Sequence, residues 1–284
     1  VINNTRIIPT NVINLTLNGP TSVIINYTLQ YMLTVKDLSG LLNGLSGWRD
    51  EGSTVTLSEP SIYNLGNETR LVFNDYEVYL LGALHSVLTS NETALTINNP
   101  YTVVVNWTRQ YQVNVSSPVP VVITTPSSAF NTTSLNIWTS EGATISIAIP
   151  RIYELGNGRR LIYIGSNETI TVNQPINVSI PITSFQRQYL ITITSEHPIN
   201  VNGTKTIQFS AWLSPGTMLT IAPETIFTNG VFMSEPGYAV TVNKPATLTI
   251  RWQINWTLTG VTYGGLAAII AVIAAVLVIR THRQ

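Results

Sequence analysis

The chain has 284 residues, of which 44% are hydrophobic and 10% charged, with 14 basic and 14 acidic residues and no cysteine. This composition excludes a disordered chain, and the neutral balance excludes an electrostatic nucleic-acid surface. The lack of cysteine excludes a disulfide framework and a thiolate metal site. At roughly 100–200 residues per domain, the length predicts two or three domains.

Three similar segments follow one another along the chain. Each begins with a Gln-Tyr pair, at Tyr31, Tyr111 and Tyr189. Each then reaches a tryptophan that is followed four residues later by a glycine, in "WRDEG", "WTSEG" and "WLSPG", and the glycine opens an alternating apolar-polar run. Because spacing and motif order are shared, the chain is predicted to contain internal repeats of one structural unit.

Short runs of Val, Ile, Thr, Tyr and Leu with a period of two lie between Gly, Pro and Asn turn signals, and this pattern predicts an all-β fold. A unit of about 70–80 residues holds enough strands for one small sandwich. We therefore predict tandem immunoglobulin-like or fibronectin-like β-sandwich domains followed by one C-terminal transmembrane helix. The predicted parts are an N-terminal strand or partial unit (1–26), three sandwiches (27–106, 107–184 and 185–253), a transmembrane helix (257–279) and a cytoplasmic tail (280–284).

The stretch between the first two units, "YTVVVNWTRQYQVNV" from Tyr101 to Val115, has no internal turn signal. Extended, it would run roughly 50 Å. We expect it to form the last strand of one sandwich and the first strand of the next. The alternative is a sharp bend at Trp107-Thr108.

Near the C-terminus, Val261 to Ile279 is an uninterrupted run of low polarity. As a helix it would be roughly 28 Å long, about one hydrocarbon core. Basic residues follow it, so the positive-inside rule places the C-terminus in the cytoplasm and the N-terminus outside. No signal peptide opens the sequence, and Val1 is expected to be a processed terminus. The predicted membrane-interface anchors are Trp252, Trp256, Tyr263, Arg280 and Arg283.

Asn-x-Ser/Thr sequons occur twelve times, about twice the number expected by chance. All of them lie on the predicted outer side, which indicates a glycosylated ectodomain at the cell surface. The alternative is that Asn and Thr serve as uncharged polar residues in strands and turns. The candidates are Asn3, Asn14, Asn26, Asn67, Asn91, Asn106, Asn114, Asn131, Asn167, Asn177, Asn202 and Asn255.

No catalytic, metal or cofactor motif stands out, and we predict that the chain is not an enzyme. The histidines are far apart, at positions 85, 197 and 282. Asp50-Glu51 is interpreted as a solvated turn rather than a cation site. The repeated Trp48, Trp138 and Trp212 are interpreted as core residues. Residues 74–89, which the second repeat lacks, are either a longer hairpin or a short helix, and either a partner-binding feature or a tolerated insertion.

The first repeat, "QYMLTVKDLSGLLNGLSGWRDEGSTVTL", resembles a repeat of archaeal cell-surface proteins that ends in a "tvxVNW" strand. The whole layout resembles the small membrane-anchored S-layer stalk protein of thermoacidophilic archaea. That resemblance implies tandem β-sandwiches, N-glycosylation and a C-terminal membrane helix, with a larger S-layer glycoprotein as partner. Such proteins usually have a coiled coil before the membrane. Here Trp252 runs almost directly into the span with no heptads, and this departure puts the stalk height and the coiled-coil trimerisation of that family in doubt for this chain.

The leading hypothesis is a structural cell-envelope protein that supports an S-layer-like lattice. Its partners would be membrane lipid, a larger glycoprotein and, in a homo-oligomer, further copies of itself, but no nucleic acid and no cofactor. Ala267, Ala271 and Ala275 recur at helical spacing and weakly favour self-association in the membrane. The alternatives are a surface adhesin or receptor, and an accessory ectodomain subunit of a membrane enzyme complex.

Overall fold

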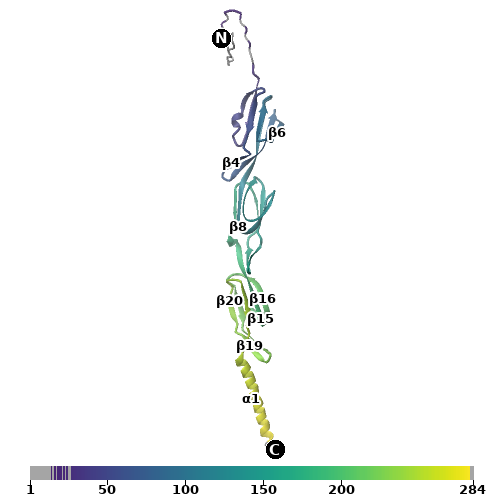
Figure 1. The fold of residues 1–284 in the computed structure, drawn as a ribbon, viewed down its shortest axis with the longest axis vertical. Coiled ribbons are helices and arrows are strands. Elements are labelled where there is room, and N and C mark those ends of the chain that lie inside the picture. The colour runs from purple at the N-terminus through teal and green to yellow at the C-terminus, as the bar shows by residue number, and fades with distance from the viewer. Residues whose placement is uncertain are drawn as a thin grey trace. The chain divides into compact units, whose positions relative to one another are not determined.

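The computed structural model describes residues 14, 16, 18–20, 22, 24 and 27–281. It confirms the predicted fold class, because β-sandwich strands fill the described part before one apolar C-terminal helix (Figure 1). The chain forms two compact units, unit 1 with residues 1–66 and 70–109, and unit 2 with residues 67–69 and 110–284. The N-terminal strand predicted over 1–26 lies mostly outside the described residues.

The strands are short and follow the turn signals in the sequence. The first seven are β1 (Gln30–Lys36), β2 (Gly47–Asp50), β3 (Thr54–Ser58), β4 (Ile62–Gly66), β5 (Thr69–Leu80), β6 (Ala83–Leu88) and β7 (Glu92–Thr96), with the 3-10 helix η1 (Asn43–Leu45). Strand β8 (Tyr101–Thr124) has residues in both units.

Unit 2 continues to the C-terminus. Its strands are β9 (Ala129–Ser140), β10 (Thr144–Ala148), β11 (Ile152–Gly156), β12 (Arg159–Tyr163), β13 (Glu168–Thr171), β14 (Ile176–Ser179), β15 (Phe185–Val201), β16 (Thr204–Leu213), β17 (Met218–Ala222), β18 (Glu224–Thr228), β19 (Val231–Glu235), β20 (Tyr238–Thr241), β21 (Ala246–Ile250) and β22 (Gln253–Ile254). The 3-10 helix η2 (Ile182–Ser184) precedes β15, and α1 (Trp256–Thr281) ends the described chain.

The sequence repeat is also a repeat of strand pairing. In each copy the strand that carries the Gln-Tyr pair runs parallel to a later strand, and the pairing begins two residues after the tyrosine, at Leu33, Val113 and Ile191. The same strand runs antiparallel to the strand that carries the tryptophan: β1 with β2, β8 with β9, and β15 with β16. Each copy therefore has the same edge geometry at its start.

The glycine after each tryptophan has a geometric cause. Gly52, Gly142 and Gly216 have φ values of +76°, +79° and +82°, where side chains other than glycine are strained. Each glycine N–H donates to a backbone carbonyl at 2.8 Å, on Ile97, Val172 and Val242 respectively. The turn at each glycine thus leads directly into the next strand, which is β3, β10 or β17.

Each copy has its own apolar core, formed by the inward face of its alternating strands. In unit 1 the core includes Leu33, Tyr76 and Val103. Unit 2 has two cores, one around Val113 and Ile145 and the other around Ile191, Leu219 and Trp252.

The stretch from Tyr101 to Val115 lies within one strand, β8, which pairs with β1 over Tyr101–Val104 and with β9 from Gln110, so the prediction of a strand shared by two copies is confirmed. The start of the third copy differs. There β14 ends at Ser179, and η2 separates it from β15. Pro181, the residue before η2, lacks the backbone N–H that a continuous strand would use.

Candidate functional site

Helix α1 begins directly below the last sandwich and is long and apolar enough to cross a membrane. Its first turns are bonded to the β18–β19 hairpin. The Phe232 N–H donates to the Thr259 hydroxyl at 3.0 Å, and the Tyr263 hydroxyl donates to the Gly230 carbonyl at 2.6 Å. Asn255 caps the helix, since its Oδ1 accepts from the Leu258 N–H at 3.0 Å. No flexible linker separates the sandwich from the helix.

The predicted interface residues differ in their surroundings. The Trp256 side chain is exposed and that of Tyr263 half-exposed, as a headgroup contact would require. Trp252 is instead buried, at 8% exposure, in the core of the last sandwich. Its Nε1 donates to Ser195 Oγ at 2.9 Å and its ring packs edge-on against His197, so the structure corrects its assignment to the interface.

The basic end of the helix is described only in part. Arg280 lies in the last turns of α1, and Arg283 lies outside the described residues. Ala267, Ala271 and Ala275 fall on exposed turns of α1, and the homo-oligomer that they favour stays a prediction.

A second candidate site is the junction between the last two copies in unit 2, formed by the β11–β12 hairpin and the start of β15. Strand β12 pairs antiparallel with β15 from Arg159–Tyr189 to Tyr163–Phe185. The Leu190 N–H donates to the Gly158 carbonyl at 2.8 Å. Within the same unit, the Gln112 N–H donates to the Glu68 carbonyl at 3.0 Å.

An arginine fixes this hairpin at the junction. The Arg160 guanidinium carbon lies 4.4 Å from the Trp212 ring centroid, and Arg160 Nε donates to Gln188 Oε1 at 2.9 Å. A guanidinium over an indole face is a favourable cation–π arrangement. Phe185, at 8% exposure, enters the core of the second copy and packs on Tyr163.

The three repeated tryptophans are not core residues, which corrects the sequence interpretation. Trp48 is 67% exposed, and Trp138 and Trp212 are half-buried. Each lies on the outward face of its strand, because the inward positions of β2, β9 and β16 alternate with it. The tryptophan is therefore a surface residue in each copy. In the third copy, Trp212 is also part of the junction with the β11–β12 hairpin.

Unit 1 contains a pair of neighbouring acids, of which Glu59 is buried and Asp37 half-buried. Asp37 Oδ1 accepts from the Trp107 Nε1–H at 3.1 Å and from the Ser39 N–H at 2.9 Å. The Ser39 hydroxyl bridges this carboxylate to Glu59, which is 3% exposed. Tyr76 lies beside the pair and donates from its hydroxyl to the Asn91 carbonyl at 2.8 Å.

The pKa values of these two acids are shifted in opposite directions. Burial, together with the nearby Asp37 charge, raises the pKa of Glu59 to about 7. Burial alone would raise the pKa of Asp37, but hydrogen bonds from Ser39, Leu42 and Trp107 outweigh it and lower that pKa. Burial and the two acids raise the pKa of the Tyr76 hydroxyl. Below about pH 7 the pair therefore carries one negative charge, on Asp37, and the ionisation of Glu59 near that pH makes the pair a pH-sensitive structural element.

The segment 74–89 is a hairpin, not a helix, formed by β5 and β6. Its turn places Leu81 at φ +50° and Gly82 at φ +87°. A leucine is strained in this region, and Leu81 is 88% exposed. A strained and exposed leucine is unusual in a turn, where Asn or Gly would be favoured.

Ten sequons lie among the described residues, and Asn3 and Asn26 lie outside them. The asparagine is exposed at Asn14, Asn67, Asn131, Asn167, Asn177 and Asn202. At four sites it is half-buried with its Nδ2 already donating to another group, namely Asn91, Asn106, Asn114 and Asn255. Glycan attachment stays a prediction, and we expect it first at the exposed set.

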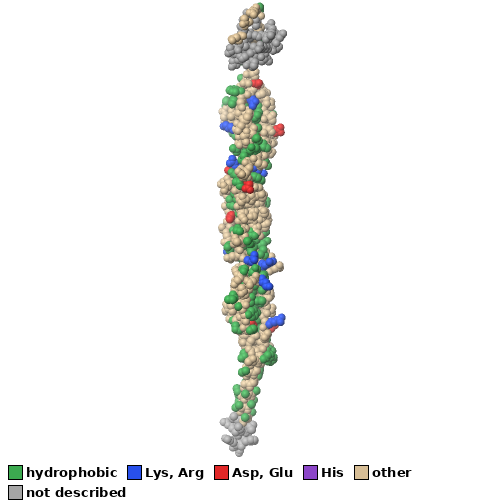
Figure 2. Space-filling view, turned by 90° about the vertical axis from the view of Figure 1, so that its left-hand side faces the viewer, with side chains coloured by type: hydrophobic (Ala, Val, Ile, Leu, Met, Phe, Trp, Pro, Cys, Tyr) green, Lys and Arg blue, Asp and Glu red, His purple; other side chains and the backbone are tan. Residues whose placement is uncertain are grey.

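The described residues show no cluster of His, Asp and Glu suited to a metal ion. Asp50 Oδ1 accepts from Gln30 Nε2 at 2.7 Å. His85 stacks on Tyr101 and His197 packs on Trp252, while His282 lies outside the described residues. Charged side chains are sparse on the face drawn in Figure 2.

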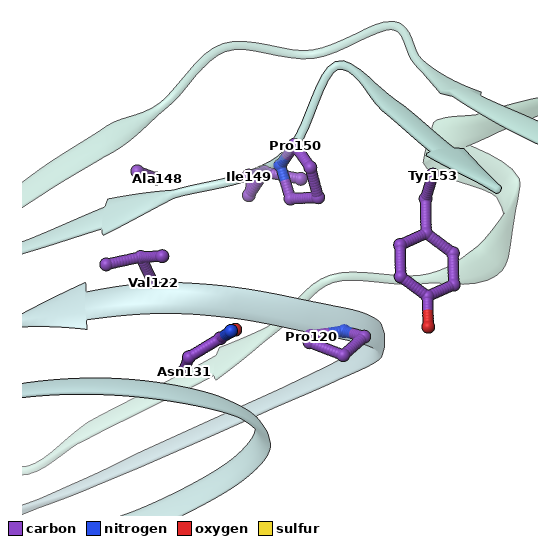
Figure 3. A pocket seen from close by; sticks show the side chains of 7 residues that line it. All are labelled: Pro120, Val122, Asn131, Ala148, Ile149, Pro150 and Tyr153. Atoms are coloured by element: carbon purple, nitrogen blue, oxygen red, sulfur yellow. The ribbon is translucent and has the colours of Figure 1, made fainter.

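A shallow hollow of about 430 Å³ lies on the second copy (Figure 3). Its polar side-chain groups are the Tyr153 hydroxyl and the Asn131 amide, a predicted glycosylation site. Such groups offer hydrogen bonds but not an acid–base pair. The lining residues are Pro120, Val122, Asn131, Ala148, Ile149, Pro150 and Tyr153.

Comparison with known proteins adds no family to this description, since neither a protein-family description nor a curated protein sequence matches the chain.

Proposed function

We propose that the chain is a structural protein of the cell envelope: a glycosylated stalk, anchored in the cytoplasmic membrane by α1, that supports an S-layer-like lattice of a larger glycoprotein. The observation that carries the proposal is the direct attachment of a β-sandwich to an apolar helix through the β18–β19 hairpin. A spacer that holds a partner at a defined distance from the membrane needs a rigid connection between its sandwich and its helix, because a flexible linker would not fix that distance.

Two further features support the surface location. The exposed sequons lie before α1 in the chain, and Arg280 follows the apolar run. Together they favour an outer ectodomain and a cytoplasmic C-terminus. Mass spectrometry of the purified full chain should therefore find glycans on exposed sequons, and protease added to intact cells should degrade the ectodomain but spare the tail.

Deletion of the gene, followed by electron tomography of the cell envelope, tests the supporting role. We expect the lattice to detach or to change its distance from the membrane, and the full chain to co-purify with a larger glycoprotein from wild-type envelopes. A lattice that keeps its normal distance in the deletion strain would rule out a stalk. Expression of the full chain from a plasmid is the control, and it should restore the distance.

A second candidate, a surface adhesin or receptor, is favoured by the β5–β6 hairpin. Leu81, Leu84 and Val87 give this hairpin an exposed apolar surface, which is typical of a binding feature. An adhesin would be dispensable for envelope architecture but needed for attachment. An attachment assay on the same deletion strain therefore distinguishes the two.

A further inference from the structure

The β18–β19 hairpin lies beside the first two turns of α1 (Figure 1). The helix groups that bond it are the Thr259 and Tyr263 hydroxyls. These are the fourth and eighth residues of α1, so the contacts extend over about 10 Å from the start of the helix. Tyr263 bonds to Gly230, in the turn of the hairpin, and Thr259 bonds to Phe232. The turn therefore points along α1, away from the core of the last sandwich.

This hairpin carries two phenylalanines where the second copy has a charged pair. Phe227 pairs across from Phe232, and in the β11–β12 hairpin Glu154 pairs across from Arg160. In both hairpins this is the last strand pair but one before the turn. The ring centroids of the two phenylalanines are 4.9 Å apart. An aromatic pair thus replaces two opposite charges in the hairpin that is next to the helix.

The surroundings of the aromatic pair are uncharged and exposed. Residues 225–234 contain no charged side chain, whereas residues 152–163 of the second copy contain three. Phe227 is 59% exposed, and at the start of α1 Trp256 is 71% and Tyr263 49% exposed. Large exposed apolar side chains in a region without charge are typical of an interaction surface.

The apolar run of α1 begins at the level of this hairpin. The run from Val261 to Ile279 is about as long as one hydrocarbon core. When it spans that core, Val261 lies at one boundary. The two residues that bond the hairpin, Thr259 and Tyr263, lie two positions before and after Val261. The hairpin would then be in the headgroup region, where aromatic rings are favoured and the polar groups of a turn can still be hydrated.

We propose that Ile226–Met233, here named the aromatic hairpin, bind the lipid surface of the membrane that α1 enters, with the Phe227 and Phe232 rings among the lipid headgroups. This contact rests on the membrane anchoring of α1 proposed above, and it gives the last sandwich a second attachment to the same leaflet. It also replaces the aromatic contact that the sequence assigns to Trp252, which is buried.

A lipid surface is the occupant that the position of the hairpin favours. The bonds to Thr259 and Tyr263 hold the hairpin at a fixed place on the helix. Insertion of α1 therefore brings Phe227 to the lipid without any further rearrangement. A protein partner would have to enter the narrow space between the sandwich and the bilayer to reach the same ring.

Nitroxide labels test the proposal, because the chain has no cysteine and a single label can be placed at a chosen position. Full-length Phe227→Cys is labelled, reconstituted in phosphatidylcholine vesicles and measured by electron paramagnetic resonance. Thr228→Cys, which retains both rings, is a second probe. Glu154→Cys, at the equivalent exposed position of the second copy, is the matched control. The ratio of accessibility to oxygen over accessibility to a water-soluble nickel chelate should be at least about threefold higher at 227 and 228 than at 154. Equal ratios at the three positions would overturn the proposal.

A label in the middle of α1, at the exposed position of Ile270→Cys, separates this contact from the anchoring itself. A label in lipid at 270 with labels in water at 227 and 228 would overturn the hairpin contact and leave the anchor intact. Labels in water at all three positions would overturn both. If the high ratio at 227 is lost when lipid is added at constant protein, a second copy covers the hairpin and the choice of lipid is wrong.

Discussion

Two regions of the molecule have the same local geometry and opposite environments. The start of β15 is covered by the β11–β12 hairpin, with Phe185 in a core and Trp212 under Arg160. The start of β1 has the same register, with Tyr27 and Trp48 in solvent. The comparison teaches that the repeated aromatic residues do not serve the interior of their own copy. In the β15 region, Phe185 and Trp212 instead contact the β11–β12 hairpin.

The largest difference in the free energy of unfolding is expected between variants of Phe185 and Tyr27, the first aromatic residue of each region. Phe185→Ala should lower the free energy of unfolding by about 3–4 kcal/mol, because it leaves a cavity in the core of the second copy. Tyr27→Ala should change it by less than about 0.5 kcal/mol, since the ring is exposed. Hydrogen exchange measured strand by strand in the full chain reports both. Similar losses for the two variants would refute the comparison.

Substitution of the tryptophans should also destabilise the β15 region more than the β1 region, but by a smaller amount. Trp212→Ala removes a half-buried ring and its arginine contact, and should destabilise the third copy by about 2 kcal/mol. Trp48→Ala should cost less than about 0.5 kcal/mol. Thermal unfolding of both variants measures how much each tryptophan contributes to stability. Arg160→Lys is the control, because it keeps the charge but loses the planar guanidinium. If Trp48→Ala destabilises as much as Trp212→Ala, Trp48 is already covered.

The two regions should also differ in their response to pH. The position of Glu59 is occupied by Ile149 in the second copy, so only unit 1 has the acid pair among the described residues. Because folding raises the Glu59 pKa from 4.5 to about 7, its stabilisation is full below pH 4.5 and is lost as the pH rises through about 7. The lowered pKa of Asp37 acts in the other direction, and its contribution is lost as the pH falls through the acid range.

Unit 1 should therefore lose about 1–2 kcal/mol between pH 4.5 and pH 7, and Glu59→Gln should abolish most of that loss. Glu92→Gln, at an exposed acid of the same unit, is the matched control and should leave the pH profile unchanged. Hydrogen exchange at several pH values separates unit 1 from unit 2. An unchanged profile in Glu59→Gln would show that another group titrates.

The smallest effect concerns the other exposed apolar element of unit 1, the turn of the β5–β6 hairpin. Leu81→Asn should stabilise this hairpin by about 0.5–1 kcal/mol, because asparagine tolerates a positive φ. Leu84→Asn, an exposed residue outside the positive-φ turn, should be neutral. If Leu81→Asn stabilises the hairpin and reduces attachment in the assay described above, the leucine is retained for contact.

The sequence repeat predicts the strands, the glycine turns and the position of the helix, because these depend on local chemistry. It does not predict which face of a strand is covered, since that depends on the neighbouring element. Trp48 and Trp252 illustrate this: Trp48 is predicted to be a core residue and is exposed, and Trp252 is predicted to lie at the membrane interface and is buried. The acid pair was also missed, although Glu59 stands where the other copies have Ile149 and Ala222. A charged residue at a position that is apolar in sister repeats is a usable signal.

The two hydrogen bonds between α1 and the β18–β19 hairpin have a mechanical consequence. Thr259 and Tyr263 are four residues apart, so they lie on one side of the helix. They fix the rotation of the helix about its own axis relative to the last sandwich. In the stalk proposed above, a torque on the helix, such as that from a second helix packing on Ala267 and Ala271, would be transmitted to the sandwich. The direction in which the last sandwich faces would then be set by the helix.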